Sequence, residues 1–579
     1  MNAALGFNDP FHDSSFARLD DNGLHHVELE RFTRQKLERQ SPLLGFLDLM
    51  PGTALDGVAA IGVVEGDLLA PLFWRIALVK AAQAGPEPLT NQLMAVLAAN
   101  QDRPLEDTQA GLTHLGALDR YRDRLLAFVT HALRPDVRVA ILGHHYCHVA
   151  NAFLSSPFDT ALSVSLDGGG YDFADGDGGR ELIYGAAYRC TAGPLRLTRV
   201  PFAPDVTAAA AFARIGTRVL ELRFGEEGTV MAMAAYGDPA RFRAALQPAW
   251  LWSTHHVLKS DEGRDGLANQ LNGLRRDMKT EQDRFDLAAA LQVEATAKVH
   301  AQLRLVVTPD VRALCLSGGL FLNCQIVGQV QGWFPWLERV YVPPAPYDGG
   351  LSIGVAQALR HVALGVPAPR PRFMPFASGP AAPVFDIIAA CRARRLQPAA
   401  ATVADVAARI ASGQIGARFG GGAESGRRAL GHRSILADPR DAGVRDRINA
   451  TIKHRAPFRP LAPMILAEDV QDWFHCPPGF ASPTMSHAIP VRDGMAPHIP
   501  AVVHRDGTAR VQTVHRELTP GLHDLLTAFA DITGVPILLN TSFNDQEPIV
   551  QTPAEAVECF LRTGLDFLYF AEPGLLLSR

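Results

Sequence analysis

Two histidines in the segment GHHYCHVANAF have the spacing of a metal-ligand pair. His144 and His148 are four residues apart, so at the start of a helix they share one face and can reach a single ion. Asp348 in PYDGG and Asp167 in SLDGGG are candidate third ligands. Each aspartate also has an ordinary explanation, because Asp348 could cap a helix and Asp167 could form a turn. Carboxylates beside imidazoles suit Fe(II), Mn(II) or Zn(II), and the spacing does not choose among them.

A second group of residues indicates binding of an anion. Five basic side chains fall within 32 residues, in loops rich in glycine and proline: Arg428, Arg433, Lys453, Arg455 and Arg459. Lysine is scarce in this chain, and Lys453 is the only lysine after Lys298. Guanidinium groups match the geometry of carboxylates and phosphates. A solvated basic surface is the alternative, but the apolar neighbours (RALG, PFRPLAPMIL) favour partly buried charges that need anionic partners.

Small polar residues next to expected strands are candidates for nucleotide binding. Asn540, Ser542 and Asn544 alternate at the end of LLNTSFN and could contact a phosphate or a sugar. Glycine-rich segments can hold a phosphate with their backbone N–H groups. The glycines in question are Gly168 and Gly169 in SLDGGG and Gly318 and Gly319 in SGGLFLN. Turn formation is the alternative for Asn540, Ser542 and Asn544.

These candidates lie where strands are expected to meet loops or helices. RVAILGHHYCHVANAFL, RALCLSGGLFLNCQIVGQV and RVYVPPAPYDGGLSIGVAQALRHVAL each predict a strand followed by a helix, and residues 286–307 predict a long helix. Two alternating runs around Asp-Asn-Gly predict a hairpin near residues 14–30. Residues 160–188 echo the plan of residues 3–30, with a strand expected at TALSVSLDGGG, then an Asp/Gly-rich loop, then ELIYGAAY. Alternating strands and helices predict an α/β fold with its site beyond the strand ends.

A proline-rich segment divides the chain. Six prolines between Pro367 and Pro383 predict an extended linker over residues 367–383. The expected domains are therefore residues 1–366 and residues 384–579. The second domain is also expected to mix helices (ADVAARIASG, TPAEAVECFLRTG) and strands (GQIGARFG, VPILLNTSFN).

Composition excludes several classes of protein. The 579 residues, 47 % hydrophobic and 20 % charged, are typical of globular protein and exclude disordered, collagenous and disulfide-scaffold chains. The net charge of −5 disfavours a nucleic-acid partner, since phosphate neutralisation requires a basic surface. Seven scattered cysteines suit a reducing compartment. With neither a signal peptide nor a membrane span expected, we predict a cytoplasmic protein. The chain also lacks a G-x-x-x-x-G-K-[ST] loop, which excludes P-loop ATPase chemistry.

The motifs together resemble the O-carbamoyltransferase family of nodulation and antibiotic-tailoring enzymes (the NodU/CmcH type). GFNDPFHDSSFA, ELERFTRQK, GHHYCHVANAF, SLDGGG and PPAPYDGGLSIGVAQAL resemble the N-terminal half of that family. ESGRRALGHRSILADPR, INATIKHRAPFRPLAPMIL, DGTARVQTV and LLNTSFNDQEPIV resemble its C-terminal half. The two motif sets occur in the order of the family and cover nearly the whole chain.

The resemblance implies a fold and a reaction. It implies a duplicated N-terminal domain like those of actin and sugar kinases (ASKHA), related to the tRNA threonylcarbamoyl transferase, and a C-terminal domain of the YrdC type. It further implies that the C-terminal domain makes carbamoyl adenylate from carbamoyl phosphate and ATP, with Mg(II) accompanying the ATP. The N-terminal domain would then move the carbamoyl group to a hydroxyl of a small natural product, beside a bound metal, usually iron.

The resemblance also assigns roles to individual residues. His144, His148 and Asp348 match the metal ligands, with Asp167 beside them. His12 and Lys36 match polar residues that activate the acceptor or contact the carbamoyl group. Asn323 matches a position on the nucleotide side. The carbamoyl phosphate and ATP site is matched by Arg428, Lys453, Arg455, Ser542 and Asn544, and Arg459 is a further candidate for binding the co-substrates.

The chain departs from the family pattern at several positions. Gly422, Ser425 and Arg427 stand where a basic residue, an aromatic residue and a proline are usual. His432, Gln546 and Thr229 replace a common Asn, Gly and Lys, respectively. Two other functions remain open on the same fold: a tRNA threonylcarbamoyl-type transferase, which the acidic balance disfavours, and a non-catalytic nucleotide-binding switch. Neither the acceptor nor the oligomeric state (monomer or homodimer) follows from the sequence.

Overall fold

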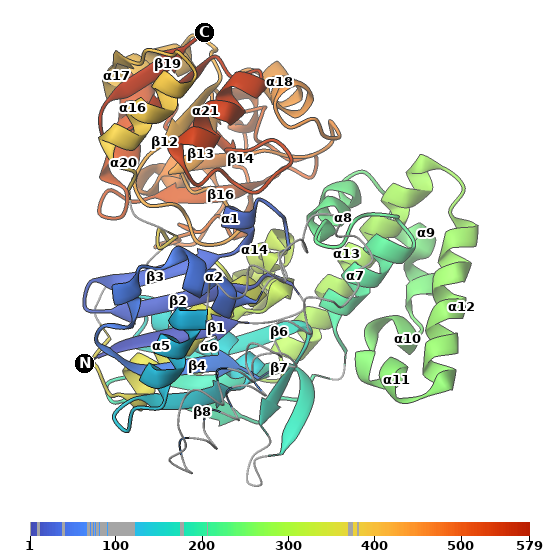
Figure 1. Ribbon diagram of the computed structural model, residues 1–579. Helices are drawn as coiled ribbons and strands as arrows, with labels where there is room; N and C mark the ends of the chain where they lie inside the picture. Colours follow the sequence, from blue (N-terminus) through green and yellow to red (C-terminus); the bar gives the residue numbers. More distant parts are fainter. Residues whose placement is uncertain are drawn as a thin grey trace.

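The N-terminal region, meaning the residues before the proline-rich segment, contains two five-stranded sheets of the same design (Figure 1). The computed structural model describes residues 2–8, 12–37, 41–65, 70, 73, 76, 80, 90, 122–173, 179–204, 206–368, 375–378 and 381–579. The first sheet has the order β3-β2-β1-β4-β5. Its strands are β1 (Ala3–Asn8), β2 (Ser15–Asp20), β3 (Gly23–Glu28), β4 (Val58–Val64) and β5 (Arg138–Leu142).

The second sheet repeats this order as β8-β7-β6-β9-β10. Its strands are β6 (Thr160–Phe173), β7 (Arg180–Ala192), β8 (Leu195–Val200), β9 (Ala313–Ser317) and β10 (Arg339–Tyr341). In both sheets the first strand pairs antiparallel with the second and parallel with the fourth. The echo between residues 3–30 and 160–188 is therefore a real duplication, and the hairpin around Asp-Asn-Gly is confirmed as β2 and β3.

Residues 174–178 of the expected Asp/Gly-rich loop lie outside the described residues, and the strand expected at TALSVSLDGGG is confirmed down to its SLDGGG segment. This segment lies inside β6, which continues to Phe173 and pairs with β7 on both sides of it. Leu166 pairs with Gly185 and Gly170 pairs with Ile183, so two extra residues bulge out of β6 between these pairs. A bulge redirects a side chain without ending the strand, and here it includes Asp167.

Two helices hold the sheets together. Helix α6 (His144–Ser155) follows the first sheet in sequence but packs on β6, β7 and β9 of the second. Helix α15 (Leu351–Gln357) follows the second sheet but packs on β1, β2 and β4 of the first. The two helices also pack against each other. This exchange places the start of α6 beside the start of α15, where His144, His148 and Asp348 lie.

The remaining helices of this region flank the sheets. Helices α1 (Glu30–Thr33), α2 (Pro42–Leu49) and α5 (Arg122–Ala132) accompany the first sheet, while a helical lobe extends from the second (Figure 1). The lobe contains α7 (Ala208–Arg218), α8 (Glu227–Ala234), α9 (Ala240–Arg243), α10 (Ala249–Trp252), α11 (Thr254–Lys259), α12 (Asp261–Asp277) and α13 (Glu281–Leu303). The long helix expected near residues 286–307 is α13, which starts with a capping box from Thr280 and Asp283. Helix α14 (Cys324–Trp333) follows β9 as expected.

The C-terminal region is built on one nine-stranded mixed sheet. Its order is β11-β19-β18-β12-β13-β17-β14-β16-β15. The strands are β11 (Ala399–Ala400), β12 (Gly416–Phe419), β13 (Arg433–Ala437), β14 (Ala462–Leu466), β15 (His487–Pro490), β16 (Thr508–Val514), β17 (Ile537–Ser542), β18 (Phe567–Phe570) and β19 (Leu575–Ser578). The helices are α16 (Val384–Ala393), α17 (Val403–Ala411), α18 (Gly443–Thr451), α19 (Val470–Trp473), α20 (Pro520–Thr533) and α21 (Pro553–Arg562). The helices and strands expected here are confirmed.

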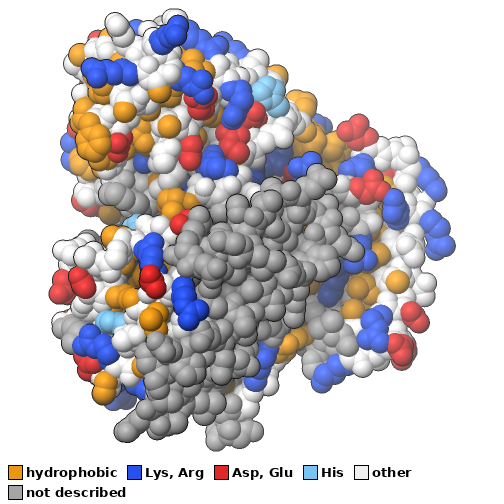
Figure 2. All heavy atoms as spheres, in the orientation of Figure 1, with side chains coloured by type: hydrophobic (Ala, Val, Ile, Leu, Met, Phe, Trp, Pro, Cys, Tyr) orange, Lys and Arg blue, Asp and Glu red, His pale blue; other side chains and the backbone are white. Residues whose placement is uncertain are grey.

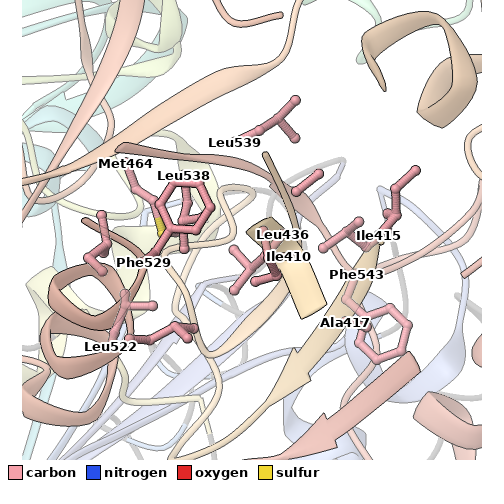
Figure 3. Close-up of a cluster of buried hydrophobic side chains, with 14 of the residues drawn as sticks. Ile410, Ile415, Ala417, Leu436, Met464, Leu522, Phe529, Leu538, Leu539 and Phe543 are labelled. Atoms are coloured by element: carbon pink, nitrogen blue, oxygen red, sulfur yellow. The ribbon is translucent and has the colours of Figure 1, made fainter. Parts of the chain in front are cut away.

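This region has its own hydrophobic core. Apolar side chains of the sheet meet those of α17 and α20, as Ile410, Leu436, Phe529 and Leu538 illustrate (Figure 3). All residues of this buried cluster come from positions after the proline-rich segment. The C-terminal region therefore buries its apolar surface largely by itself.

The described part of the proline-rich segment contacts both regions. The backbone N–H of His26 in β3 donates to the carbonyl of Ala377 at 2.8 Å. Ser378 forms an isolated bridge with Ala423, and the N–H of Ser425 donates to the carbonyl of Pro375 at 2.8 Å. Residues 369–374 and 379–380 of the expected linker lie outside the described residues. The described residues of this segment therefore connect the two regions through backbone hydrogen bonds.

The surface and the cysteines agree with the composition. On the face in Figure 2, acidic and basic side chains are interspersed over both regions. All seven cysteines are free, and six of them are buried. Among the helices in the described ranges, none has the length and apolar character needed to cross a lipid bilayer.

Candidate active site

A cavity of about 1010 Å³ lies between the N-terminal and C-terminal regions. Its N-terminal wall includes His12, Lys36, Asp167 and Asp348, together with residues of α7 and α8. The C-terminal wall includes four of the five basic residues expected to bind an anion, namely Arg428, Lys453, Arg455 and Arg459. The structure thus brings both groups of candidate residues to one space, although they are far apart in the sequence.

Four side chains cluster at the N-terminal end of this cavity. One ligand atom from each of His144, His148, Asp167 and Asp348 lies within 4.8 Å of all the others. Nε2 of His148 is 3.1 Å from Oδ2 of Asp167 and 3.4 Å from Oδ1 of Asp348. Nε2 of His144 is 3.7 Å from the same Asp348 oxygen. Helix α6 supplies the histidines, the β6 bulge supplies Asp167, and the turn before α15 supplies Asp348.

The donor set of this cluster fits a divalent cation. Nε2 of His144 and both ring nitrogens of His148 are buried without a hydrogen-bond partner among the described residues. Burial lowers the pKa of His148, but the two carboxylates outweigh burial and raise this pKa to about 9. Burial acts to raise the pKa of Asp167, yet the neighbouring histidines hold it below its usual range. Two carboxylates and two imidazoles that face one point form a ligand set that suits Fe(II), Mn(II) or Zn(II).

Next to the cluster, His12 is held by its neighbour Asp13. Nδ1 of His12 lies 2.8 Å from Oδ2 of Asp13, and the His12 ring lies 5.0 Å from the ring of Phe224, centroid to centroid. Burial lowers the pKa of His12, but Asp13 and Asp348 raise it above its ordinary value overall. Lys36 lines the same cavity, and burial lowers the pKa of its ammonium group.

The basic residues form a cluster on the opposite wall. Arg428, Arg455, Arg459 and Arg510 all line the cavity. Burial, followed by the charge of Arg510, lowers the pKa of Arg428 to about 9. Burial and the charges of Arg459 and Arg510 lower the pKa of Arg455, also to about 9. Because these cations repel one another, an anion placed between them would stabilise their charged forms. The cluster therefore suits phosphate groups.

Lys453 reaches the cavity but is bound by its neighbours. Its ammonium group donates to the side-chain oxygen of Ser542 at 3.1 Å and to Oδ1 of Asn544 at 2.6 Å, as well as to both backbone carbonyls. Burial lowers the pKa of Lys453 well below its usual range. The structure thus brings these three predicted residues together as one hydrogen-bonded group.

The other sequence candidates lie at different depths. Asp167, Gly168, Gly319 and Asn323 line the cavity, whereas Gly169 and Gly318 lie behind it and Arg433 is buried against Phe419. The N–H of Gly319 donates to Oδ2 of Asp167 at 2.8 Å. The side chain of Asn323 caps α14 and also bonds Gln292 at 2.9 Å. Asn540 also lines the cavity, and its side chain donates to Gln512 at 2.9 Å.

Arg510 is a cavity residue that the sequence motifs did not mark as a candidate. It lies in DGTARVQTV, which carries part of the family resemblance, and its Nε is buried without a hydrogen-bond partner among the described residues. Its position in β16, which pairs with β14, brings it to the basic cluster from far along the chain. A basic residue within that motif was the available signal.

Three departures from the family pattern lie at the interface between the regions. Oγ of Ser425 is 3.1 Å from Nδ1 of His26, and Thr229 accepts a hydrogen bond from Arg459. Arg427 donates to both carboxylate oxygens of Asp13, at 2.6 and 2.8 Å.

The other departures make local contacts. His432 stacks on Phe376 at 3.6 Å between ring centroids and bonds the carbonyl of Gly422 at 2.7 Å. Gln546 donates to the carbonyl of His454 at 3.4 Å.

The spacing G-x-S-x-G occurs once, at residues 350–354, but it does not form a serine nucleophile. Ser352 lies in α15, is fully buried, and shares a 2.8 Å hydrogen bond with Ser15. It is therefore a packing residue.

Comparison with known proteins identifies the chain as a transferase of carbamoyl groups. Residues 3–357 match the profile described as Carbamoyltransferase N-terminus, and residues 407–575 match Carbamoyltransferase C-terminus. The chain belongs to the carbamoyltransferase family.

Two curated relatives illustrate the range of that family. Nodulation protein NolO of Bradyrhizobium diazoefficiens is 35 % identical over 440 residues, which cover 74 % of this chain and 77 % of NolO. The 3′-hydroxymethylcephem-O-carbamoyltransferase of Amycolatopsis lactamdurans is 31 % identical over 332 residues, which cover 56 % of this chain and 59 % of that enzyme. Among solved structures, xylulose kinase from Lactobacillus acidophilus aligns with a TM-score of 0.30 and 10 % identity over 63 % of this chain and 90 % of that chain.

Proposed function

We propose that this protein makes carbamoyl adenylate from carbamoyl phosphate and ATP and transfers the carbamoyl group to a hydroxyl of a small molecule. The observation that carries the proposal is the shared cavity, which has a cluster of cations on its C-terminal wall and a histidine–carboxylate cluster on its N-terminal wall. The first chemistry needs cations around phosphates, and the second needs a base near the acceptor.

The C-terminal region would form the adenylate, as a domain of the YrdC type does. One water, carbamoyl phosphate and ATP would give carbamoyl adenylate, pyrophosphate and phosphate. Arg428, Arg455, Arg459 and Arg510 would bind the phosphates, because their mutual repulsion is relieved only by anions. Lys453 would act with Ser542 and Asn544 as one unit on the same wall.

The N-terminal region would carry out the transfer. His12 would accept the proton of the acceptor hydroxyl, and Lys36 would contact the carbamoyl group. His144, His148, Asp167 and Asp348 would hold a divalent metal, for which Fe(II) is our first candidate. When bound, such an ion supplies a Lewis acid that neutralises charge on the adenylate. Because the cavity is shared, the reactive adenylate need not be released to water between the two reactions.

The acceptor is expected to be a small molecule. The relatives named for nodulation and for a hydroxymethyl cephem support a hydroxyl-bearing natural product. We further expect the protein to work in the cytoplasm.

Product analysis tests this proposal. Incubation with ATP and carbamoyl phosphate should give AMP and pyrophosphate, and a suitable acceptor should gain the mass of one carbamoyl group. ADP and phosphate without AMP would contradict the adenylate route. A purified protein that retains RNA would favour the tRNA-modifying alternative, whereas steady AMP release with an acceptor excludes a non-catalytic switch.

A further inference from the structure

Arg427 reaches from the C-terminal region into the active site of the N-terminal region. One nitrogen, Nη2, donates to Oδ1 and Oδ2 of Asp13 at 2.6 and 2.8 Å. The guanidinium carbon lies 4.4 Å from the centre of the Tyr347 ring, and Tyr347 directly precedes Asp348. Only 4 % of the Asp13 side chain is exposed, so the Arg427–Asp13 pair is shielded from solvent on the aspartate side.

Asp13 in turn orients His12. Burial acts to raise the pKa of Asp13, but Arg427 and His12 lower it below its ordinary value overall. The ionised carboxylate is only an acceptor, so Nδ1 of His12 must donate to it across the 2.8 Å contact. Nε2 is then the ring nitrogen left to accept a proton.

The loop that carries Arg427 is fixed across the interface at the preceding residue. The N–H of Gly426 donates to Oε2 of Glu28 at 2.8 Å, and its carbonyl accepts from Nη2 of Arg31 at 2.5 Å. Gly426 has φ +85°, and a Cβ there would lie 2.2 Å from the carbonyl oxygen of Pro344. Only glycine fits this approach. The start of the Arg427 side chain is therefore fixed relative to the N-terminal region.

We propose that Arg427 is a positioning residue for His12 that acts through Asp13, an inference that rests on the proposed function. In the transfer step, Nε2 of His12 takes the proton of the attacking hydroxyl, while the hydroxyl oxygen bonds to the carbamoyl carbon. The bond between that carbon and the phosphate oxygen breaks, and AMP leaves with the electron pair. Arg427 lines the same cavity, but its Nη2 is held by Asp13, so it would act on this step through Asp13 and His12. The next residue, Arg428, belongs to the basic cluster that lines the cavity. The loop that carries both arginines would therefore serve both half-reactions.

The test compares two arginines that bridge the same interface. Arg34 donates to the carbonyls of Ile549 and Pro548 at 2.9 and 2.6 Å, and its side chain is 26 % exposed against 25 % for Arg427. Arg427→Gln and the control Arg34→Gln are each assayed for carbamoyl-phosphate-dependent exchange of pyrophosphate into ATP. A single turnover with labelled carbamoyl phosphate then measures breakdown of the bound adenylate, with water as the acceptor.

Arg427→Gln should slow adenylate breakdown about 10- to 100-fold, the scale for removing a partner that orients a functional group. Its exchange rate should stay within about two-fold of wild type, as should both rates of Arg34→Gln. His12→Gln should slow breakdown at least as much. Millimolar guanidinium chloride should restore part of the breakdown rate of Arg427→Ala and none of that of His12→Gln.

Several results would overturn the inference. One is a fall of the exchange rate in Arg427→Gln as large as the fall of its breakdown rate. Another is an unchanged breakdown rate in Arg427→Gln or in His12→Gln. The third is a breakdown rate of Arg427→Ala that guanidinium does not restore. A wild-type protein without any exchange would instead remove the proposed function itself. The exchange assay of the wild type separates that failure from the others.

Discussion

Gly328 offers a way to separate the two regions without touching the proposed catalytic residues. It lies in α14, where a Cβ would be 1.9 Å from the carbonyl oxygen of Ala488 in β15 and 2.8 Å from its carbonyl carbon. Ordinary contacts between such atoms begin near 3.4 Å. Gly328→Ala should therefore push the two backbones apart by about 1.5 Å. Within the helix itself, alanine is favoured over glycine by about 1 kcal/mol, so α14 should persist.

We predict that this displacement uncouples the two half-reactions. The basic cluster lies within the C-terminal region, so exchange of pyrophosphate into ATP should stay within about two-fold of wild type. The walls of the cavity come from both regions. A misplacement of about 1 Å can cost 100-fold in a reaction that depends on positioning. Transfer should fall on that scale, and carbamoyl adenylate should escape into solution.

The measurement is the fraction of labelled carbamoyl adenylate that stays with the protein after rapid ultrafiltration. Gly332→Ala is the matched control, because Gly332 lies in the same helix, one turn later, and a Cβ there would meet nothing within 4 Å. Gly332→Ala should retain the intermediate as wild type does. Equal retention by the two variants would refute the idea that this interface encloses the intermediate.

Two further predictions concern the metal and the pH dependence of stability. Elemental analysis should find about one Fe, Mn or Zn ion per chain in wild type and a loss of that ion in His148→Ala; a fully active, metal-free preparation would contradict the site. Burial lowers the pKa of His487 from 6.5 to about 4. As the pH falls below 6.5, His487 is therefore protonated in the unfolded chain before it is protonated in the folded protein. His487 should then contribute up to about 3 kcal/mol to the fall in the free energy of unfolding between pH 6.5 and 4, and His487→Gln should show a correspondingly smaller fall in denaturant titrations at each pH. An identical pH dependence of the free energy of unfolding in the two proteins would show that His487 does not contribute to it.

Local patterns in the sequence predicted the elements of the fold well. The i, i+4 histidine pair marks the start of α6, and the Asp-Asn-Gly turn marks the β2–β3 hairpin. Both depend only on neighbouring residues, so they can be read from spacing. The bulge in SLDGGG could not be predicted, because a bulge within a long strand and a turn have the same glycine-rich composition.

The site was predictable only in part, because its parts come from distant segments. His144 and His148 are close in sequence, but the positions of Asp167 and Asp348 beside them depend on the exchange of α6 and α15 between the sheets. The pairing of Arg427 with Asp13 joins residues more than 400 positions apart. Nothing in either local sequence indicates such a contact. Arg510 reaches the basic cluster for the same reason, through the pairing of β16 with β14.

We expect the two walls of the cavity to carry different half-reactions. Lys453→Met removes the ammonium group bound to Ser542 and Asn544, and His148→Ala removes a member of the opposite cluster. We predict that Lys453→Met lowers pyrophosphate exchange at least about 100-fold, the scale for one lost electrostatic contact. His148→Ala should keep exchange and lose transfer.

The most direct test is to supply preformed carbamoyl adenylate to both variants, with a hydroxyl compound that the wild-type protein carbamoylates. Transfer should be restored in Lys453→Met, because the missing step has been bypassed. It should stay low in His148→Ala, whose defect lies after adenylate formation. Restoration in His148→Ala but not in Lys453→Met would contradict the assignment of the two reactions to the two walls.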